Sequence, residues 1–346
     1  MKQDKTLTMQ KKDGTQAYSE FTLTLLRWYQ ENGRELPWRD SPDAYAIWLS
    51  EIILQQTRIA QGQAYWERFM ARFPNVETLA AASEDEVLRL WQGLGYYSRG
   101  RNLLAAARQI VARGGFPDTL AEIRALKGVG DYTAAAIGSI AFGLPAAVLD
   151  GNVYRVLARF YGIATPVGST AAKKAFTELA QALLPPDRPG DFNQALMDFG
   201  ALQCTPQNPQ CLTCPLAARC EALRSGRTAL LPVRKPAGTV QTRRFHYVYI
   251  RCRGFVAFRR RGPGDIWQGL WEPYLEEGEE VRGFPGMKCL RSGVRHQLTH
   301  RILIADFYLL ECEEKPFLTE DYIWIPEVGL DNYAKPRLVE VLLESL

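Results

Sequence analysis

Long hydrophobic runs are missing from this sequence of 346 residues. No stretch of about 18 consecutive apolar residues occurs, so no segment has the length and character of a transmembrane helix. The first residues carry lysines without an apolar stretch, so we expect no secretory signal there. These absences together predict a protein of the cytoplasm that has no membrane partner.

A strong charge imbalance and internal repeats are also missing. The formal net charge is only +4, which fits a partner with phosphates but does not require one. No tandem repeat of fixed period occurs. The hydrophobic fraction of 47% is enough to build packed cores, and the length suits two domains.

A change in composition divides the sequence into two predicted domains. We expect residues 1–16 to be a disordered, solvated tail and residues 17–224 to be mostly helical, with glycine or proline between the helical patterns. Residues 225–242 combine proline, glycine and basic residues, which is typical of a linker. Residues 243–346 are rich in aromatic and β-branched residues and end in a helical pattern, which predicts a smaller α+β domain.

Cysteines crowd into one short segment. Four of the seven lie between residues 204 and 220 with the spacing C-x6-C-x2-C-x5-C, namely Cys204, Cys211, Cys214 and Cys220. In a cytoplasmic chain such a cluster favours a metal site over disulfides. Structural zinc sites usually present two close pairs, whereas only Cys211 and Cys214 are close here, and no histidine lies nearby. The spacing therefore favours an iron–sulfur centre and leaves zinc as the alternative.

A glycine turn precedes an alanine-rich helical pattern in the segment "LKGVGDYTA", which begins at Leu126. A Gly-x-Gly turn, here Gly128 and Gly130, leaves backbone N–H groups open to an anion at a helix start. DNA phosphate is a natural ligand for such a turn. The alternative is that these glycines only end one helix before the next begins.

The turn and the cysteine spacing together resemble the endonuclease III-like, helix-hairpin-helix DNA glycosylases. The resemblance implies a 4Fe–4S cluster on the four cysteines, which does not perform the hydrolysis, and DNA binding at the glycine turn. Family members that also cut the strand carry a lysine where this chain has Tyr132. Tyrosine cannot form the imine that this cleavage needs, so the resemblance implies base removal alone. Tyr132 then either supports the reacting sugar or packs at the helix start.

One carboxylate stands alone in an almost wholly apolar helical pattern. Glu51 has Ile47, Trp48 and Leu54 as its helical neighbours. A carboxylate in such a setting is costly unless it is used in catalysis or paired with a buried arginine. An apolar setting raises a carboxyl pKa, which suits the general acid that protonates a leaving base.

The segment around Glu51, "LPWRDSPDAYAIWLSEIILQQT", resembles the adenine glycosylase branch, the MutY family. The resemblance implies that Glu51 is the general acid acting on adenine N7. It also implies that Asp150, in "VLDGNVYR", stabilises the sugar cation, and that Asn152 orients Asp150 or the attacking water. From the residues alone, Asp150 is better explained as the N-cap of a helix, and Asn152 could equally be an ordinary capping residue.

A base buried in duplex DNA has to be flipped out before its glycosidic bond can be reached. In the family, segments similar to those of this chain wedge into the base stack, touch the opposite base or line the adenine pocket. The candidates in these segments are Trp38, Arg39, Gln55, Gln56, Tyr96 and Gln194. Simple packing is the alternative for Tyr96, and a surface salt bridge is the alternative for Arg39.

The C-terminal segment "IWQGLWEPYL" resembles the Nudix-like C-terminal domain of the MutY family. The Nudix metal-binding box G-x5-E-x7-R-E-x2-E-E is absent, so we expect no nucleotide hydrolysis. The resemblance implies that this domain reads 8-oxoguanine through a loop containing Leu298, Thr299 and His300. Leu298 stands where the family has an aromatic residue.

The sequence thus predicts an all-α helix-hairpin-helix glycosylase domain with a 4Fe–4S loop at 204–220, followed by a Nudix-like α+β domain. We expect a monomeric enzyme that removes adenine opposite 8-oxoguanine or guanine in duplex DNA, associated with the nucleoid if the source is a bacterium. Two alternatives stay open. One is an endonuclease III-like glycosylase that removes oxidised pyrimidines and cuts the strand, and the other is a non-catalytic DNA-binding module.

Overall fold

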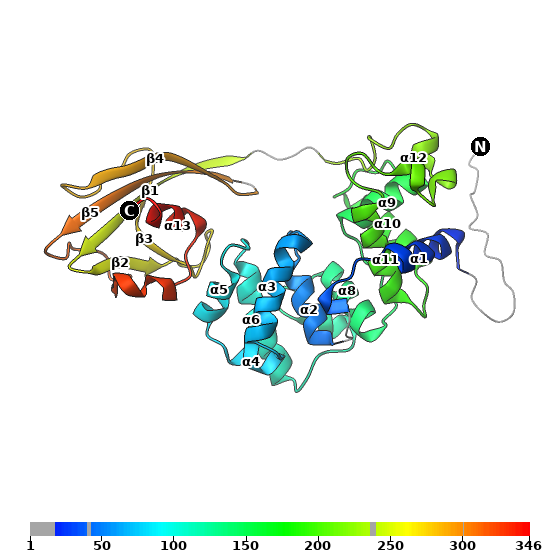
Figure 1. Cartoon of the computed structure of the whole chain (residues 1–346), viewed down its shortest axis with the longest axis horizontal. Helices are drawn as coiled ribbons and strands as arrows, with labels where there is room; N and C mark the ends of the chain where they lie inside the picture. The colour runs from blue at the N-terminus through cyan, green and yellow to red at the C-terminus, as the bar shows by residue number, and fades with distance from the viewer. Residues whose placement is uncertain (1–17, 40–42, 236–239, 300) are drawn as a thin grey trace. The chain divides into compact units, whose positions relative to one another are not determined.

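A computed structural model of the protein describes residues 18–39, 43–235, 240–299 and 301–346 (Figure 1). The chain forms two compact units, Met1–Gln55 with Gln109–Pro236 and Gln56–Arg108 with Ala237–Leu346. Each unit is therefore built from two stretches of chain. The domain limits expected at 224 and 243 stay a prediction.

The first unit is helical, as predicted. Its elements are α1 (Glu20–Asn32), η1 (Pro37–Arg39), α2 (Ala44–Ile53), α7 (Leu120–Ala125), α8 (Asp131–Phe142), α9 (Gly151–Tyr161), α10 (Thr170–Leu183), α11 (Pro189–Leu202), η2 (Cys211–Thr213), η3 (Ala217–Arg219) and α12 (Glu221–Arg224). Side-chain caps begin several of them: Ser19 caps α1 and Asp150 caps α9. Gly143 and Gly162 end α8 and α9 in the left-handed conformation, with φ of 64° and 70°.

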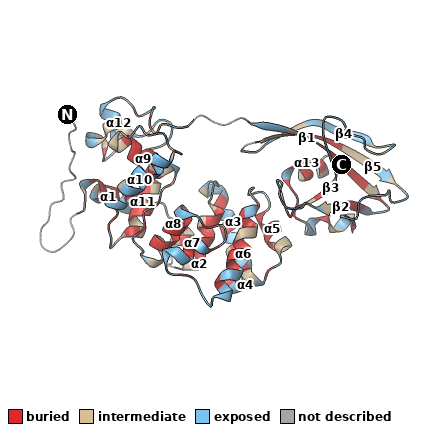
Figure 2. Cartoon of the chain, turned by 180° about the vertical axis from the view of Figure 1, so that it is seen from behind, coloured by how far each residue is buried: buried red, intermediate tan, exposed pale blue. Residues whose placement is uncertain are grey.

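One core of the first unit lies among α1, α8, α9, α10 and α11. The buried residues of these helices are red in Figure 2. Phe176, Phe192 and Phe199 are almost wholly buried in it. Trp28 of α1 meets Phe199 of α11 edge to face, with ring centroids 4.9 Å apart. This core sets the positions of the helix ends that carry Tyr132 and Asp150.

The second unit combines helices with a mixed sheet. Its elements are α3 (Ile59–Arg72), α4 (Val76–Ala81), α5 (Glu84–Trp91), most of α6 (Ser98–Ala112), β1 (Gln241–Cys252), β2 (Phe255–Arg260), β3 (Trp271–Glu277), β4 (Lys288–Gln297), β5 (Arg301–Cys312), β6 (Tyr322–Pro326), η4 (Glu327–Asn332) and α13 (Arg337–Leu343). The strand order is β4-β5-β1-β3-β2-β6. β1 and β5 run parallel in register from Gln241↔Arg301 to Cys252↔Cys312, and the other pairs are antiparallel.

Alternation along β1 gives the sheet an apolar layer on each face. Phe245, Tyr247 and Tyr249 point to the side covered by α13, whereas Val248 and Ile250 belong to a smaller core on the other side. β1 and β2 form an antiparallel hairpin. Its two turn residues, Arg253 and Gly254, both have positive φ, which matches the twist of a two-residue hairpin.

None of the helices in the described residues is long and apolar enough to cross a membrane.

One close helix crossing in the first unit lies beside the start of α9. A Cβ atom on Gly200 of α11 would approach the Cβ of Asn152 to 2.6 Å and its Cα to 3.0 Å. Glycine at this position lets the two backbones approach, and the carbonyl of Gly200 accepts a hydrogen bond of 2.6 Å from Arg155 Nη2. A side chain at 200 would push α11 away from the residues that follow Asp150.

We expect G200A to lower the free energy of unfolding by about 1–3 kcal/mol, because overpacking against backbone cannot be relieved by a side-chain rotation. Urea unfolding followed by circular dichroism measures the loss. G151A is the matched control, since a Cβ at Gly151 meets no atom within 4 Å. Equal stability of the two variants would contradict the close crossing.

Candidate active site

Glu51 lies near the end of α2. Nearly all of the remaining residues of this helix are buried. Its own side chain keeps part of its surface open to solvent, although protein atoms surround it closely. Burial raises the pKa of Glu51 to about 7, and the charge of Asp150 adds to the rise. A hydrogen bond from Tyr132 and the charge of Arg39 act in the opposite direction. The carboxyl can therefore hold or release a proton near neutral pH.

Asp150 is the N-cap of α9 and is a carboxylate of the same site. Its Oδ1 accepts a hydrogen bond of 2.7 Å from the Val153 amide, and its Oδ2 accepts one of 2.6 Å from Asn152 Nδ2. Burial raises its pKa, while these hydrogen bonds and the charge of Arg155 lower it. The capping interpretation of Asp150 is thus confirmed, and its charge also raises the pKa of Glu51.

Tyr132 follows the glycine turn in the first turn of α8. Gly128 has a φ of 78°, a conformation that favours glycine, and Gly130 is the N-cap of the helix. The Tyr132 hydroxyl contacts Met197 Sδ at 3.3 Å and is hydrogen-bonded to Glu51. Burial raises the pKa of Tyr132 well above 10, so its hydroxyl stays a neutral donor. The side chain both packs and touches the carboxyl.

Asn152 links Asp150 to a buried arginine on the same helix. It donates to Asp150 while its Oδ1 accepts a hydrogen bond of 2.7 Å from Arg155 Nη2. Arg155 Nε also donates to the carbonyl of Cys204 at 2.7 Å. This arginine was not among the residues singled out from the sequence. The signal that could have found it is the pair of arginines, Arg155 and Arg159, four residues apart in an apolar helix.

Arg39 is bound by a carboxylate that sequence reasoning also missed. Its Nη1 and Nη2 donate to Asp198 at 2.8 and 3.0 Å, so the salt bridge considered for Arg39 exists, although it is buried and not on the surface. Trp38 beside it is buried, and Gln194 lies half-buried on α11. Asp198 lies among mostly apolar residues of α11, so the argument that identified Glu51 would have found it.

The predicted base-contacting residues fall in both units. In the first unit, Gln55 Nε2 donates to Thr133 Oγ1 at 3.1 Å. In the second unit, Gln56 and Tyr96 have left-handed φ values of 56° and 47°, and Tyr96 is 45% exposed. The packing alternative for Tyr96 is therefore not what the structure shows.

A loop of the second unit places Tyr96 beside one of the predicted lesion-reading residues. The Tyr96 hydroxyl is hydrogen-bonded to Thr299 Oγ1. The Leu298 amide donates to the carbonyl of Arg301 at 2.8 Å, between the end of β4 and the start of β5. His300 lies outside the described residues. Exposed Tyr96 and Thr299 thus share one surface.

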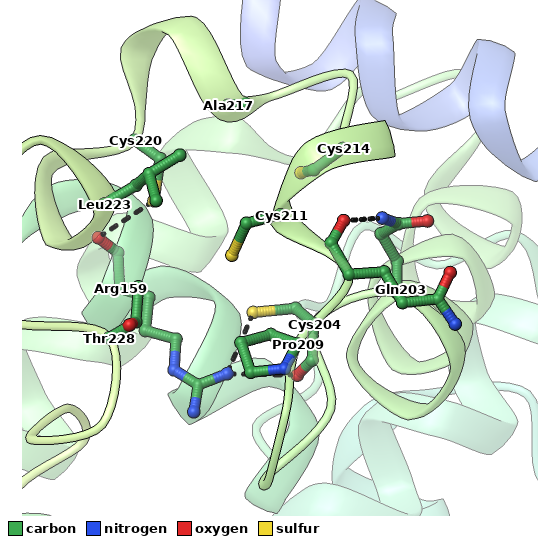
Figure 3. Close-up of a pocket in the computed structure, with 11 residues that line it drawn as sticks. Arg159, Gln203, Cys204, Pro209, Cys211, Cys214, Ala217, Cys220, Leu223 and Thr228 are labelled. Carbon is green, nitrogen blue, oxygen red and sulfur yellow. Dashed lines mark hydrogen bonds between the residues drawn. The ribbon is translucent and has the colours of Figure 1, made fainter.

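The four clustered cysteines line one cavity that is open in part to solvent (Figure 3). The lining residues that matter here are Cys204, Cys211, Cys214, Cys220 and Arg159. Arg159 Nη1 donates to Cys204 Sγ at 3.4 Å, and backbone amides hydrogen-bond to the sulfurs of Cys214 and Cys220. Burial raises the pKa of Cys214 to about 11 and also raises the pKa of Cys220, whereas these N–H donors act in the opposite direction. Four soft sulfur ligands around one cavity nevertheless fit a soft metal centre.

These sulfurs surround a space and do not converge on a point. Within the part of the chain that the structure describes, no three His, Cys, Asp or Glu side chains are placed to hold a single metal ion. All four cysteines of the loop are free thiols and half-buried.

Two family models match the chain: "HhH-GPD superfamily base excision DNA repair protein" over residues 49–185 and "NUDIX domain" over residues 246–345. "Adenine DNA glycosylase" of Buchnera aphidicola subsp. Acyrthosiphon pisum is 31% identical over 94% of this chain and 97% of its own length. "Adenine DNA glycosylase" of Mus musculus is 46% identical over 62% of this chain and 44% of its own length. The chain thus spans less than half of the mouse relative.

Among solved structures, one described as a thermostable thymine-DNA glycosylase is similar to the helical part. It is 30% identical, has a TM-score of 0.54, and the match covers 59% of this chain and 95% of that one. The predicted fold class, a helical glycosylase fold followed by a Nudix-like mixed sheet, is confirmed.

The raised pKa of Glu51 has a cost in stability. The carboxyl has an ordinary pKa of 4.5 in the unfolded chain and one of about 7 in the folded protein. The cost is therefore absent below pH 4.5, grows as pH rises toward 7, and is constant above. We expect E51Q to be more stable than the parent by a few kcal/mol at pH 8 and equally stable at pH 4.

Urea unfolding at the two pH values measures this difference. E178Q is the control, because Glu178 is exposed on α10 and its ion pair with Lys174 is long, at 4.0 Å. If the stability difference between E51Q and the parent were the same at both pH values, the raised pKa of Glu51 would be contradicted.

Proposed function

Because the chain belongs to the adenine DNA glycosylase family, within the HhH-GPD superfamily, we propose that it excises adenine from duplex DNA in base-excision repair. The observation that carries the proposal is the pair of carboxyls in the first unit. Glu51 holds a proton near neutral pH, and Asp150 is a capped carboxylate whose charge acts on it. N-glycosidic cleavage needs one group of each kind.

The proposed reaction breaks the bond between the sugar C1′ and adenine N9. Glu51 donates its proton to adenine N7, so that the electron pair of the broken bond leaves with a neutral base. The ionised carboxylate of Asp150 stabilises the oxocarbenium ion. Asn152 holds Asp150 Oδ2 and guides the attacking water, which adds its oxygen to C1′ and releases one proton to the solvent. Regeneration of the Glu51 proton from solvent completes the cycle.

Base removal without strand cleavage is part of the proposal. The hydroxyl of Tyr132 occupies the place beside Glu51 and stays protonated because burial raises its pKa. It can donate a hydrogen bond to the carboxyl or the sugar, but it supplies no amine for an imine. The glycine turn at Gly128 and Gly130 binds a phosphate of the DNA backbone through its amides.

Recognition of 8-oxoguanine or guanine opposite the adenine is assigned to exposed residues of the second unit. Tyr96 offers an exposed ring for stacking between bases, and Thr299 offers a hydroxyl next to it. Leu298 and His300 belong to the same loop. Gln55 and Gln56 supply amides for the space that the flipped adenine leaves. Trp38, Arg39 and Gln194 are assigned to the adenine pocket.

A 4Fe–4S cluster is the proposed cofactor, held by Cys204, Cys211, Cys214 and Cys220. Only Cys211 and Cys214 form a close pair in the sequence, and this spacing favours an iron–sulfur cluster over zinc. The cluster would supply no hydrolytic chemistry; it would hold the loop and its basic residues in place against DNA. We further propose a monomer in the cytoplasm, acting at the nucleoid if the source is a bacterium.

We expect E51Q and D150N to lower single-turnover adenine release by at least about 100-fold, since each removes a group that acts on the transition state. The substrate is a duplex with one adenine opposite 8-oxoguanine, and products are resolved with and without alkali. The parent protein should yield strand breaks only after alkali. E178Q should match the parent.

Breaks without alkali would contradict the assignment of Tyr132. Processing of an oxidised-pyrimidine duplex in place of adenine would favour the strand-cutting alternative, and binding without base release would favour a non-catalytic module.

Metal analysis should find about four irons and four acid-labile sulfides per chain in protein purified without air, with the absorption of an iron–sulfur protein. C211S should lower the iron content, whereas C289S should not, because Cys289 is exposed on β4 outside the cluster. One equivalent of zinc without sulfide would contradict the cluster.

A further inference from the structure

Arg99 is a buried arginine in the first turn of α6, and only 7% of the residue is exposed. Burial lowers the pKa of its guanidinium to about 10. A cation at the start of a helix also meets the positive end of the helix dipole. Both effects oppose a charge at this position, so the contacts that Arg99 makes have to offset them.

The Arg99 guanidinium binds the turn that precedes α6. Its Nη2 donates to the carbonyls of Leu94 and Gly95, both at 3.2 Å. Its Nη1 donates to Thr57 Oγ1, also at 3.2 Å. The indole Nε1 of Trp91 donates to the same Gly95 carbonyl at 3.0 Å. One planar cation thus joins two consecutive carbonyls of the turn to the segment at Thr57.

The backbone of this turn needs such support. Gly93, Gly95 and Tyr96 have φ values of 93°, 71° and 47°. Glycine adopts such values freely, whereas a residue with a side chain does so rarely and at a cost in energy. The carbonyl of Tyr96 accepts a hydrogen bond of 2.8 Å from the Arg99 amide. Backbone and side chain of Arg99 therefore both help to hold Tyr96 in this conformation.

The same guanidinium contacts the Tyr96 side chain. Its central carbon lies over the Tyr96 ring, 5.6 Å from the ring centroid, and over the Trp91 ring at 5.2 Å. Tyr96 nevertheless stays 45% exposed. A buried cation thus supports a ring of which nearly half is open to a nucleic-acid base.

We propose that Arg99 is a positioning residue for DNA binding, which fixes the Tyr96 ring in the conformation that stacks between bases. The inference rests on the proposed function, since Tyr96 is assigned there to the strand opposite the adenine. A ring that is fixed before DNA arrives loses less conformational freedom on binding. More of its stacking energy then contributes to affinity.

A purely structural role is the alternative, in which Arg99 only stabilises the turn between α5 and α6. Loss of such a role lowers stability, and any effect on DNA binding is the same whether or not residue 96 has its ring. A positioning role predicts instead that a change at Arg99 has no effect once the ring is gone. Comparison of single and double variants therefore separates the two roles.

The experiment measures dissociation constants for a duplex in which the adenine opposite 8-oxoguanine carries a 2′-fluorine that prevents cleavage. Y96A should weaken binding by about tenfold or more, because the stacking of the ring on a base is lost. R99K should weaken it by about fivefold, since one ammonium cannot join two carbonyls and stack on a ring as a planar guanidinium does.

R108K is the matched control and should bind like the parent. Arg108 lies on the same helix and also donates to two carbonyls of a turn, those of Ala80 and Ala82, at 3.1 and 3.0 Å. R99K and R108K thus remove the same kind of contact from two different turns. Circular dichroism and urea unfolding verify that each variant is folded.

The double variant R99K/Y96A should bind as weakly as Y96A. Unchanged binding by folded R99K, or equal weakening by R99K with and without the ring, overturns the proposal. T57V is the second variant, because it removes the hydroxyl that anchors Nη1. It should weaken binding by about twofold, and T57V/Y96A should match Y96A. If R99K does not fold, T57V decides, and binding equal to the parent then overturns the proposal.

A fluorescent base separates this proposal from the function itself. 2-Aminopurine placed next to 8-oxoguanine emits more strongly when its neighbours no longer stack on it. The parent should raise the emission of the uncleavable duplex, R99K should raise it clearly less, and Y96A should leave it unchanged. These results would support the role of Arg99 even if adenine were not released from a cleavable duplex. Equal emission with R99K and the parent would overturn that role even in an active enzyme.

Discussion

Two buried arginines on α9 hold the first unit together around its carboxylates. Arg155 and Arg159 cannot leave their charges without partners in a core, so each gathers backbone carbonyls. Arg155 donates hydrogen bonds to the carbonyls of Gly151, Gly200 and Cys204. Arg159 donates hydrogen bonds of 2.7–3.1 Å to the carbonyls of Thr205, Pro206 and Leu231. The start of the cysteine loop is thereby tied to the helix that Asp150 caps.

Two other carboxyl groups, those of Glu51 and Asp198, lie in apolar helices, and their pKa values change in opposite directions on burial. Glu51 is approached by one hydroxyl and one more distant cation, so desolvation dominates and its pKa rises to about 7. Asp198 receives two guanidiniums directly, so hydrogen bonding dominates and its pKa falls. The same residue pattern thus yields a proton donor in one helix and a permanent anion in the other. The count and distance of arginines decide which.

Acidic residues of the second unit are engaged with arginines and backbone amides. Glu272 on β3 is buried between Arg259 and Arg261. Glu276 accepts hydrogen bonds from the amides of Arg282 and Gly283, at 2.7 and 3.3 Å. Carboxylates used in this way stabilise the sheet and its loops. Their roles agree with the absence of the Nudix metal-binding box from the segment that resembles that fold.

Local chemistry was enough to identify much of the site. The cost of a charge in an apolar helix pointed to Glu51, the glycine turn predicted the start of α8, and the cysteine spacing predicted one metal-binding loop. Each of these signals lies within a few residues of chain. Only the tertiary structure decided that Asp150 both caps α9 and raises the pKa of Glu51, that Arg39 binds Asp198 159 positions away, and that residues 56–108 group with the C-terminal sheet. Those facts depend on which buried charges meet across the packed helices, and sequence spacing does not carry that information.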